Sequence, residues 1–448
     1  MSKLVADHIL ERLRAWGVYR IYGYPGDGIN ALLGALDRAE GDPEMIQARH
    51  EEMAAFMATG HAKYSGGVGV CLATQGPGAI HLLNGLYDAK LDHQPVVAIV
   101  GQQARMSLGS DYQQEVDLDA LLKDVAGEFV QTCMVPQQAP HLIDRAMRIA
   151  KATRSPSCII VPNDVQEAAY EEPPCKHGAV HSSEAELSGE RLAPSDDALR
   201  AAADVLNAGE KVAILIGQGA KRAPDDVRAV ADALGAGVAK ALNGRAALPD
   251  DLPYVTGSIG LLGTKPSNDM MEGCDTLLLV GTNFPYSEWL PEPGQARAVQ
   301  IDVDARLIGN RYPTEVNLVG DAAQTLRALL PLLQSKARNG WREEIEENVS
   351  RWWEILDDRA HQEADPVNPQ LVFHELSARL PTSRTRSRRG CSGSTACGST
   401  VRRMSARGGT RRCRPAARQC SRSSPTPRSR RCRRTSASSK PKGWRGRS

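Results

Sequence analysis

The first 165 residues alternate between helix-like and strand-like patterns of apolar positions. Residues 2–16 place apolar side chains at helical spacing, and Gly17 follows as a residue that commonly ends a helix. Further helical patterns occupy residues 29–39, 51–64 and 139–151, and a stretch that runs to about residue 90. Short apolar runs between them predict buried strands at residues 18–23, 44–48, 68–74, 96–100 and 157–161. This order predicts a parallel sheet with helices on both faces.

A second alternating region follows at residues 196–335. Strand patterns lie at residues 212–217, 276–281 and 298–303, and helical patterns lie at residues 225–234 and 322–333. Residues 166–195 carry Glu, Pro, Ser and Gly without a clear period, which predicts a linker. The fold class is therefore α/β, with two successive doubly wound parallel-sheet domains.

The pattern changes again after residue 335. Residues 336–380 predict a helical connection, with helices at residues 341–364 and 369–376. The second of these helices looks like the first element of a third domain that then does not continue.

Residues 381–448 have a different composition from the rest of the chain. They contain 19 Arg and 2 Lys, but no Asp, Glu, Leu, Ile, Phe or Tyr. Such a segment buries too little apolar surface to offset its ordering entropy, so we expect a disordered basic tail. We favour an out-of-frame translation of GC-rich DNA, a frameshift, because the change is abrupt. The alternative is a genuine basic tail that binds nucleic acid or an acidic partner.

Charge and cysteine content narrow the class of protein. The tail holds 21 of the 55 basic residues and none of the 53 acidic ones, which leaves residues 1–380 with 34 basic residues and a net charge of −19. This acidic body argues against a nucleic-acid partner outside the tail. The sequence predicts no signal peptide and no membrane span, and its scattered cysteines predict reduced thiols. We therefore expect a cytoplasmic protein.

Two short motifs follow predicted strands in the first region. Arg49-His50-Glu51-Glu52 opens a helix, where a carboxylate interacts favourably with the helix dipole. Gln75-Gly76-Pro77-Gly78 places glycines at a helix N-terminus, where a ligand can approach the backbone closely. Taken alone, each motif is more typical of an ordinary capping carboxylate or βα turn.

The order of four motifs carries more information. Tyr24-Pro25-Gly26-Asp27, the two motifs above and Gly109-Ser110-Asp111-Tyr112-Gln113-Gln114-Glu115 together resemble the pyrimidine-binding domain of thiamine-diphosphate enzymes. The likeness is to the branch of pyruvate oxidase and quinone-dependent pyruvate dehydrogenase, with acetolactate synthase as a more distant relative. The resemblance implies a pyrimidine-binding domain at residues 1–165 and the start of a diphosphate-binding domain at residues 336–380.

The resemblance also implies roles for single residues. Glu51 would hydrogen-bond the cofactor's aminopyrimidine and promote loss of the proton from the thiazolium carbon. Gln114 would face the substrate or the cofactor. The pyrimidine pocket would be shaped by Gly26, Gly76, Pro77 and Gly78.

The second domain resembles the FAD-binding middle domain of the same branch. The implied flavin contacts are Thr256, Gly257, Ser258 and Ile259 along the ribityl-phosphate portion. The implied contacts near the adenosine portion are Gly281, Thr282, Asn283, Phe284 and Pro285. Asp302 would contact the ribose of the adenosine. Gly217-Gln218-Gly219 is only a partial dinucleotide signal because its third glycine is missing. Some relatives keep this domain without flavin.

The family also binds Mg²⁺, but the sequence yields no metal ligand. Gly26-Asp27-Gly28 looks like the family's metal motif, yet it belongs to the entry turn of the first domain. The true motif would lie in the diphosphate domain, where the tail stands instead.

The implied reaction is flavin-linked oxidative decarboxylation of pyruvate or a similar 2-oxo acid, in a homodimer or homotetramer. The alternatives are acetolactate-synthase-like carboligation and a non-catalytic cofactor-binding fragment. We expect this chain to bind thiamine diphosphate poorly and to turn over no 2-oxo acid.

Overall fold

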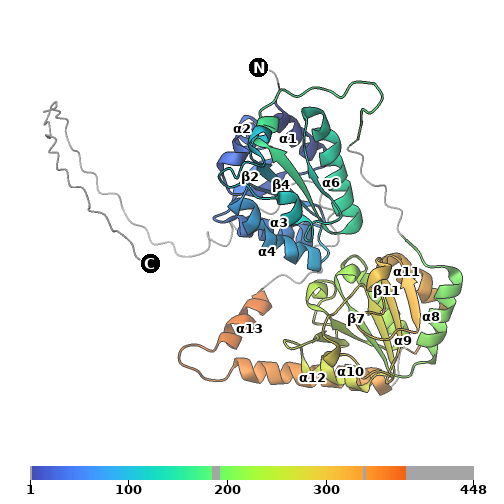
Figure 1. The fold of residues 1–448 in the computed structure, drawn as a ribbon. Helices are drawn as coiled ribbons and strands as arrows, with labels where there is room; N and C mark the ends of the chain where they lie inside the picture. Colours follow the sequence, from blue (N-terminus) through green and yellow to red (C-terminus); the bar gives the residue numbers. More distant parts are fainter. Residues whose placement is uncertain (1–2, 184–191, 337–339, 380–448) are drawn as a thin grey trace, which may run out of the picture. The chain divides into compact units, whose positions relative to one another are not determined.

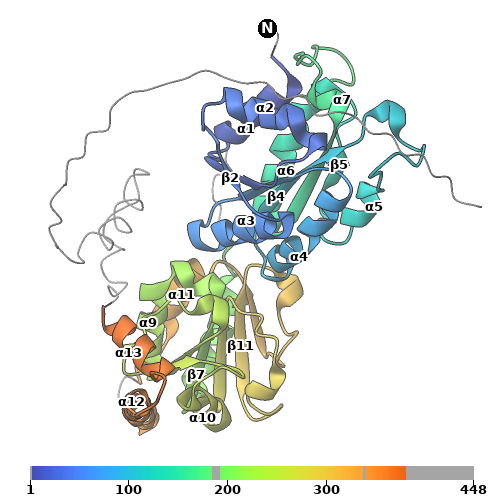
Figure 2. The same cartoon turned by 90° about the vertical axis from the view of Figure 1, so that its left-hand side faces the viewer.

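The computed structural model describes residues 3–183, 192–336 and 340–379, and the chain divides into two compact units at Arg191 and Leu192. Both units appear in Figures 1 and 2, and each is built around one sheet. The predicted tail at residues 381–448 lies outside the described residues, as does part of the predicted linker. No described helix is both long and apolar enough to cross a membrane.

The first unit contains a six-stranded sheet in the order β2-β1-β3-β4-β6-β5, in which all neighbours are parallel. Its strands are β1 (Arg20–Gly23), β2 (Glu44–Gln47), β3 (Gly69–Ala73), β4 (Val96–Gln102), β5 (Val130–Thr132) and β6 (Pro156–Pro162). Its α-helices are α1 (Val5–Ala15), α2 (Asn30–Arg38), α3 (Glu51–Ser65), α4 (Pro77–Leu91), α5 (Leu118–Leu122), α6 (Ala139–Thr153) and α7 (Asn163–Gln166).

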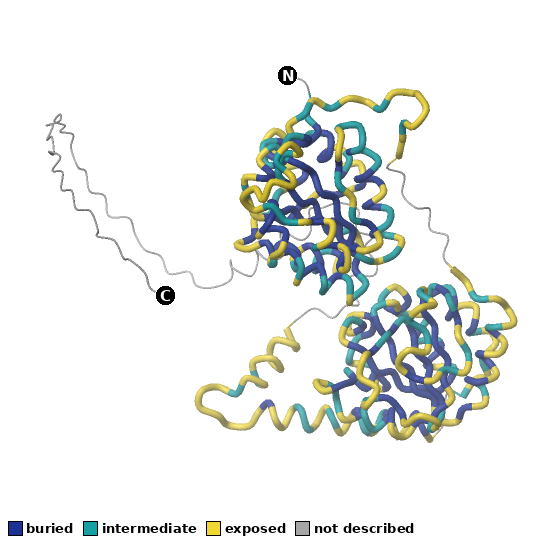
Figure 3. The backbone as a smooth tube through the Cα atoms, viewed as in Figure 1, coloured by how far each residue is buried: buried dark blue, intermediate teal, exposed yellow. Residues whose placement is uncertain are grey.

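Alternation along the strands gives this sheet two buried faces. Val70 and Leu72 of β3 pack with α1, α2 and α6, whereas Cys71 and Ala73 pack with α3, α4 and α5. Figure 3 shows the strands as the buried centre of the unit. Strands buried on both faces read as continuous apolar runs, which is why the sequence located most of them.

The second unit has its own parallel six-stranded sheet, in the order β12-β11-β10-β7-β8-β9. Its strands are β7 (Val212–Ile216), β8 (Gly237–Lys240), β9 (Val255–Ser258), β10 (Thr276–Val280), β11 (Arg297–Asp302) and β12 (Val316–Val319). One face packs with α8 (Asp196–Ala208), α9 (Pro224–Leu234) and α11 (Ala322–Leu329), and the other with α10 (Lys265–Gly273) and α12 (Gly340–Ala360). A last helix, α13 (Pro369–Arg379), contacts α12.

The predicted α/β class with successive parallel sheets is confirmed, but several element predictions were wrong. The sequence pattern did not predict strands β5, β8, β9 and β12 or helices α5, α7, α8 and α10. These strands have only three or four residues, and β8 and β9 contain glycine. The helix predicted at residues 322–333 ends at Leu329 and continues as a 3₁₀ turn, because Pro331 lacks an N–H for the helical ladder. The helix predicted at residues 341–364 ends at Ala360.

Candidate functional site

The strand order of the first sheet defines where a ligand would bind. Strand β1 lies between β2 and β3. The chain passes from β1 to β2 on one side and then to β3 on the other side of β1, so the strand order reverses between β1 and β3. Crevices at such switch points, outside the carboxyl ends of the strands, are the usual ligand sites of open α/β sheets. The loops that follow β1 and β3 carry two of the four motifs, at residues 24–27 and 75–78.

Glu51 is the first residue of α3, and its carboxylate is almost completely buried. The residue is 8% exposed, and Oε2 lies 3.0 Å from Nδ1 of His81 on α4. The rings of His50 and His81 lie 4.3 Å apart between centroids. The position at the helix N-terminus favours the negative charge of the carboxylate, and the histidine supplies a hydrogen-bond partner.

Three of the predicted glycines lie where a side chain would not fit. A Cβ on Gly26 would lie 2.6 Å from Cβ of Thr74, and one on Gly78 would lie 2.7 Å from Cγ2 of Thr74 and 3.2 Å from Oε1 of Glu51. Gly76 has a φ of +54° and approaches Gln114, whose main-chain oxygen would be 2.6 Å from an added Cβ. The structure therefore brings Gly26, Gly76 and Gly78 together with both predicted catalytic residues.

A hydrogen-bond network around Gln75 connects these loops. Gln75 is 2% exposed, and its amide nitrogen lies 3.1 Å from Oε1 of Gln114 and 3.2 Å from Oδ1 of Asp27. The hydroxyl of Thr74 donates a hydrogen bond to Oε1 of Gln75 over 2.6 Å. The same hydroxyl accepts a hydrogen bond from the main-chain nitrogen of Gly28 over 3.0 Å. A cavity of about 270 Å³ opens beside this network, lined by Asp27, Gly28, Asn30, Gln75, Gln103, Tyr112, Gln113, Gln114 and Asn163.

The loop that carries Gln114 is held in an unusual conformation. Gln114 has a φ of +63°, a backbone angle that residues other than glycine rarely adopt. The neighbouring carboxylate of Glu115 accepts hydrogen bonds from the main-chain nitrogens of Gly109, over 2.5 Å, and Tyr112, over 3.0 Å. These two bonds lower the pKa of Glu115 because they stabilise its charged form. The loop thus presents Gln114 to Gln75 at a defined position.

Sequence reasoning missed three residues of this site. Thr74 and Gln75 received no role, although residues directly after a buried parallel strand regularly face a ligand crevice. His81 lies 30 positions from Glu51, and only the packing of α4 against α3 brings the two together. Pro77 was predicted to shape the pyrimidine pocket. It is the first residue of α4 and is exposed, unlike the buried Gly76 and Gly78 on either side of it.

The second sheet has a switch point of its own between β7 and β10. A Cβ on Gly219 would lie 2.7 Å from Cα of Gly281, and the Gly219 nitrogen donates to the Gly281 oxygen over 3.1 Å. Residues 256–258 lie in β9 and residue 259 follows it, whereas residues 281–285 follow β10. Ile259 and Phe284 belong to the same buried cluster, and the ring of Phe284 lies 3.2 Å from where a Cβ on Gly260 would stand. The structure therefore brings the two predicted flavin segments together.

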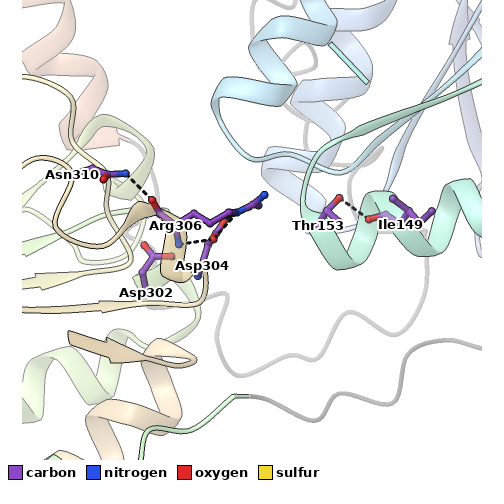
Figure 4. Close-up of polar contacts among 6 residues, drawn as sticks. All are labelled: Ile149, Thr153, Asp302, Asp304, Arg306 and Asn310. Carbon is purple, nitrogen blue, oxygen red and sulfur yellow. Dashed lines mark hydrogen bonds and ion pairs between the residues drawn. The ribbon is translucent and has the colours of Figure 1, made fainter. Parts of the chain in front are cut away.

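Two residues of this second group differ in what they offer a ligand. The hydroxyl of Thr256 lies inside the unit, 2.8 Å from Oγ of Ser267 and 3.2 Å from the main-chain oxygen of Val238. Asp302 ends β11 and is 8% exposed, and its Oδ1 accepts from the Asp304 nitrogen over 3.0 Å. Figure 4 shows Asp302 beside Asp304 and Arg306, whose side chains form an ion pair at 2.8 Å.

Two clusters of potential metal ligands occur among the described residues. One comprises His50, Glu51 and His81, and the other comprises Asp357, His361 and His374. Both contain two histidines, whereas Mg²⁺ takes oxygen ligands. We therefore assign neither cluster to the Mg²⁺ that the resemblance implies.

Comparison with known proteins agrees with this geometry. Residues 3–121 match the N-terminal TPP binding domain of thiamine pyrophosphate enzymes, and residues 199–329 match their central domain.

Three relatives illustrate the range of similarity. A pyruvate oxidase of Lactiplantibacillus plantarum is 30% identical over 377 residues, 84% of this chain and 61% of that protein. The large subunit of acetolactate synthase isozyme 2 from Escherichia coli is 31% identical over 389 residues, 84% of this chain and 66% of that protein. An uncharacterized 42.6 kDa protein of Pseudomonas amyloderamosa is 34% identical over 364 residues, 81% of this chain and 90% of that protein.

The chain thus spans less than two thirds of the length of the pyruvate oxidase and of the acetolactate synthase. The matched models cover the site at the β1 and β3 edge and the central sheet, and the predicted resemblance is confirmed. The chain belongs to the family of thiamine pyrophosphate enzymes.

Proposed function

We propose that the first unit binds the aminopyrimidine of thiamine diphosphate at the carboxyl ends of β1 and β3, with Glu51 as its proton-handling residue. The observation that carries this proposal is the buried Glu51 carboxylate, which lies close to Gly78 in the first turn of α4. The glycines at 26, 76 and 78 let Thr74, Gln114 and Glu51 pack closely together, which brings the predicted catalytic side chains to one edge of the sheet. The residues present therefore fit the cofactor.

Bound thiamine diphosphate supplies a thiazolium that accepts the electron pair released when a 2-oxo acid loses carbon dioxide. Glu51 would hold or donate a proton at its carboxyl oxygen, and His81 would orient that carboxylate through the 3.0 Å contact. Gln114, fixed by Gln75, would present an amide to the reacting groups. The low exposure of Glu51 keeps water away from its carboxyl group.

For the second unit we propose FAD, with Gly281 and Asp302 as its principal contacts. Gly219 and Gly281 let the loops after β7 and β10 pack against each other at the switch point, where α/β sheets bind dinucleotides, and a carboxylate at the end of β11 suits a ribose hydroxyl. Bound FAD would accept two electrons. Flavin absorbance should appear in purified protein and should be lost in Asp302→Ala; a colourless wild-type protein that takes up no added FAD would contradict this assignment.

The favoured reaction is flavin-linked decarboxylation of pyruvate or a similar 2-oxo acid, and carboligation to acetolactate is the second candidate. Relatives named for each activity match the chain at about the same identity, 30% and 31%. Product analysis separates them, because oxidation yields acetate and carboligation yields acetolactate. Cofactor binding without either product would identify a non-catalytic protein.

Binding of thiamine diphosphate, measured by isothermal titration calorimetry on the full chain, tests the proposal. We expect weak, saturable binding that falls at least about tenfold in Glu51→Ala, since a contact worth about 1.4 kcal/mol is lost. Glu52→Ala, one position along the same helix, serves as the matched control and should bind like the wild type. Equal affinity of Glu51→Ala and the wild type would refute the proposal.

A further inference from the structure

A second cluster of metal-binding side chains lies far along the chain from the proposed cofactor contacts. Asp357 lies in the last turn of α12, His361 is the first residue after that helix, and His374 projects from α13. All three residues are exposed. Helices α12 and α13 contact each other, so two separate elements supply the cluster.

The turn between the two helices is ordered by one side chain. The amide nitrogen of Asn368 lies 2.7 Å from the main-chain oxygen of Arg359 and 3.1 Å from that of Ala360, which satisfies carbonyls at the end of α12. Its Oδ1 accepts from the Gln370 nitrogen over 3.0 Å and so caps α13. Asn368 thus fixes the end of one helix relative to the start of the other, and the cluster is preorganised.

Both distances from Asp357 to the histidines match a tetrahedral metal site, and the ligand atoms of all three residues lie within 4.8 Å of one another. Oδ1 of Asp357 lies 3.5 Å from Nδ1 of His361 and 3.6 Å from Nε2 of His374. With zinc–ligand bonds of about 2.0–2.1 Å, neighbouring ligands of a tetrahedron stand about 3.4 Å apart. Nδ1 of His361 also lies 2.9 Å from the main-chain oxygen of Asp357, a hydrogen bond that a metal at this nitrogen would replace.

The surroundings favour a cation over an anion. Residues 354–365 contain five acidic side chains and one arginine. Two imidazoles and one carboxylate form a ligand set that zinc accepts, with water in the fourth position. Mg²⁺ and Ca²⁺ prefer oxygen ligands and suit the cluster less well.

We propose that Asp357, His361 and His374 bind a zinc ion that joins α13 to α12. Helix α13 has no buried residue, so its side chains contribute little apolar stabilisation to its position. A metal shared by the two helices would supply that stabilisation from the surface. The site is independent of the proposed cofactor function.

Amide hydrogen exchange of the full chain, measured by mass spectrometry with and without Zn²⁺, tests this proposal. Peptides of α13 should exchange at least about tenfold more slowly with a small excess of Zn²⁺. His374→Ala should abolish the slowing, and His361→Ala should weaken or abolish it. His177→Ala removes another exposed histidine and should respond like the wild type.

The readout is local, so zinc held by cysteines elsewhere does not imitate it. The altered side chains are exposed, and far-ultraviolet circular dichroism should report an unchanged fold in each variant. Unchanged exchange of α13 in the wild type would overturn the proposal. Equal slowing in the wild type and His374→Ala would overturn it as well, because zinc would then act without this histidine.

Discussion

His8 on α1 is a buried imidazole that carries no charge at neutral pH. Its residue is 8% exposed, neither ring nitrogen has a hydrogen-bond partner among the described residues, and its ring stacks on Tyr170 at 3.8 Å. Burial, followed by the nearby charge of Lys3, lowers the pKa of His8 to about 4 from its ordinary value of 6.5. Arg12 also lowers this pKa, whereas Glu11 and Glu172 raise it. Burial is the largest of these effects.

This histidine predicts a specific loss of stability in acid. The unfolded chain takes up the proton near pH 6.5 and the folded chain near pH 4, so folding is destabilised as the pH falls between these values, by about 3 kcal/mol in total. His8→Phe keeps the stacking and removes the titration. Urea unfolding at pH 7.5 and pH 5 should show the wild type losing about 2 kcal/mol more than His8→Phe. Equal losses would show that His8 is protonated in the folded state.

Some residues of the candidate site could be identified from the sequence, and others could be identified only from the fold. Glu51 and the glycines at 26, 76 and 78 belong to contiguous motifs, so the sequence could single them out before any fold was considered. His81 could not be given a role, because its contact with Glu51 exists only through the packing of two helices. For Thr256 the sequence motif suggested a ligand contact, but in the structure its hydroxyl points into the protein interior.

At the level of elements, the contact between α3 and α4 positions Glu51 relative to His81. The helices approach closely at Gly85, where an added Cβ would lie 2.5 Å from Cβ of Ala55 and 2.6 Å from the nitrogen of Phe56. The Thr59 hydroxyl lies 2.9 Å from the Ala55 oxygen and 3.0 Å from the Gly85 oxygen, so its one hydrogen can be donated to a carbonyl of either helix. This spacing requires glycine at position 85.

Gly85→Ala should therefore destabilise the protein by about 1–3 kcal/mol, because the methyl group has no space between the helices. Gly60→Ala is the matched control: Gly60 lies in α3, and nothing stands within 4 Å of its added Cβ. That substitution should stabilise the helix by roughly 0.5–1 kcal/mol. Chemical denaturation monitored by circular dichroism measures both changes. A neutral Gly85→Ala would mean that the helices separate at little cost.

The elements that the sequence located are those with a long, regular pattern. Strands β4 and β6 have seven residues each, all buried, and both were predicted. Strands β8 and β9 have four residues each and derive their burial from neighbours in the sheet, which a local pattern does not contain.

At the scale of the molecule, each unit has its own apolar interior. The clusters of buried side chains on the two faces of the first sheet draw only on residues 5–165, and those of the second sheet draw only on residues 199–349. Met1–Arg191 expressed alone should therefore unfold cooperatively in urea. A fragment without a cooperative transition, or one that binds a hydrophobic dye strongly, would contradict this independence.

The central claim is that Glu51 handles the proton of thiamine diphosphate at the edge of the first sheet. Hydrogen–deuterium exchange at the thiazolium carbon, followed by NMR with the cofactor in excess over the full chain, measures that proton transfer directly. The wild type and Glu52→Gln should accelerate exchange over free cofactor, and Glu51→Gln should lose roughly 10²-fold or more of that acceleration. Exchange in Glu51→Gln as fast as in the wild type would contradict the account.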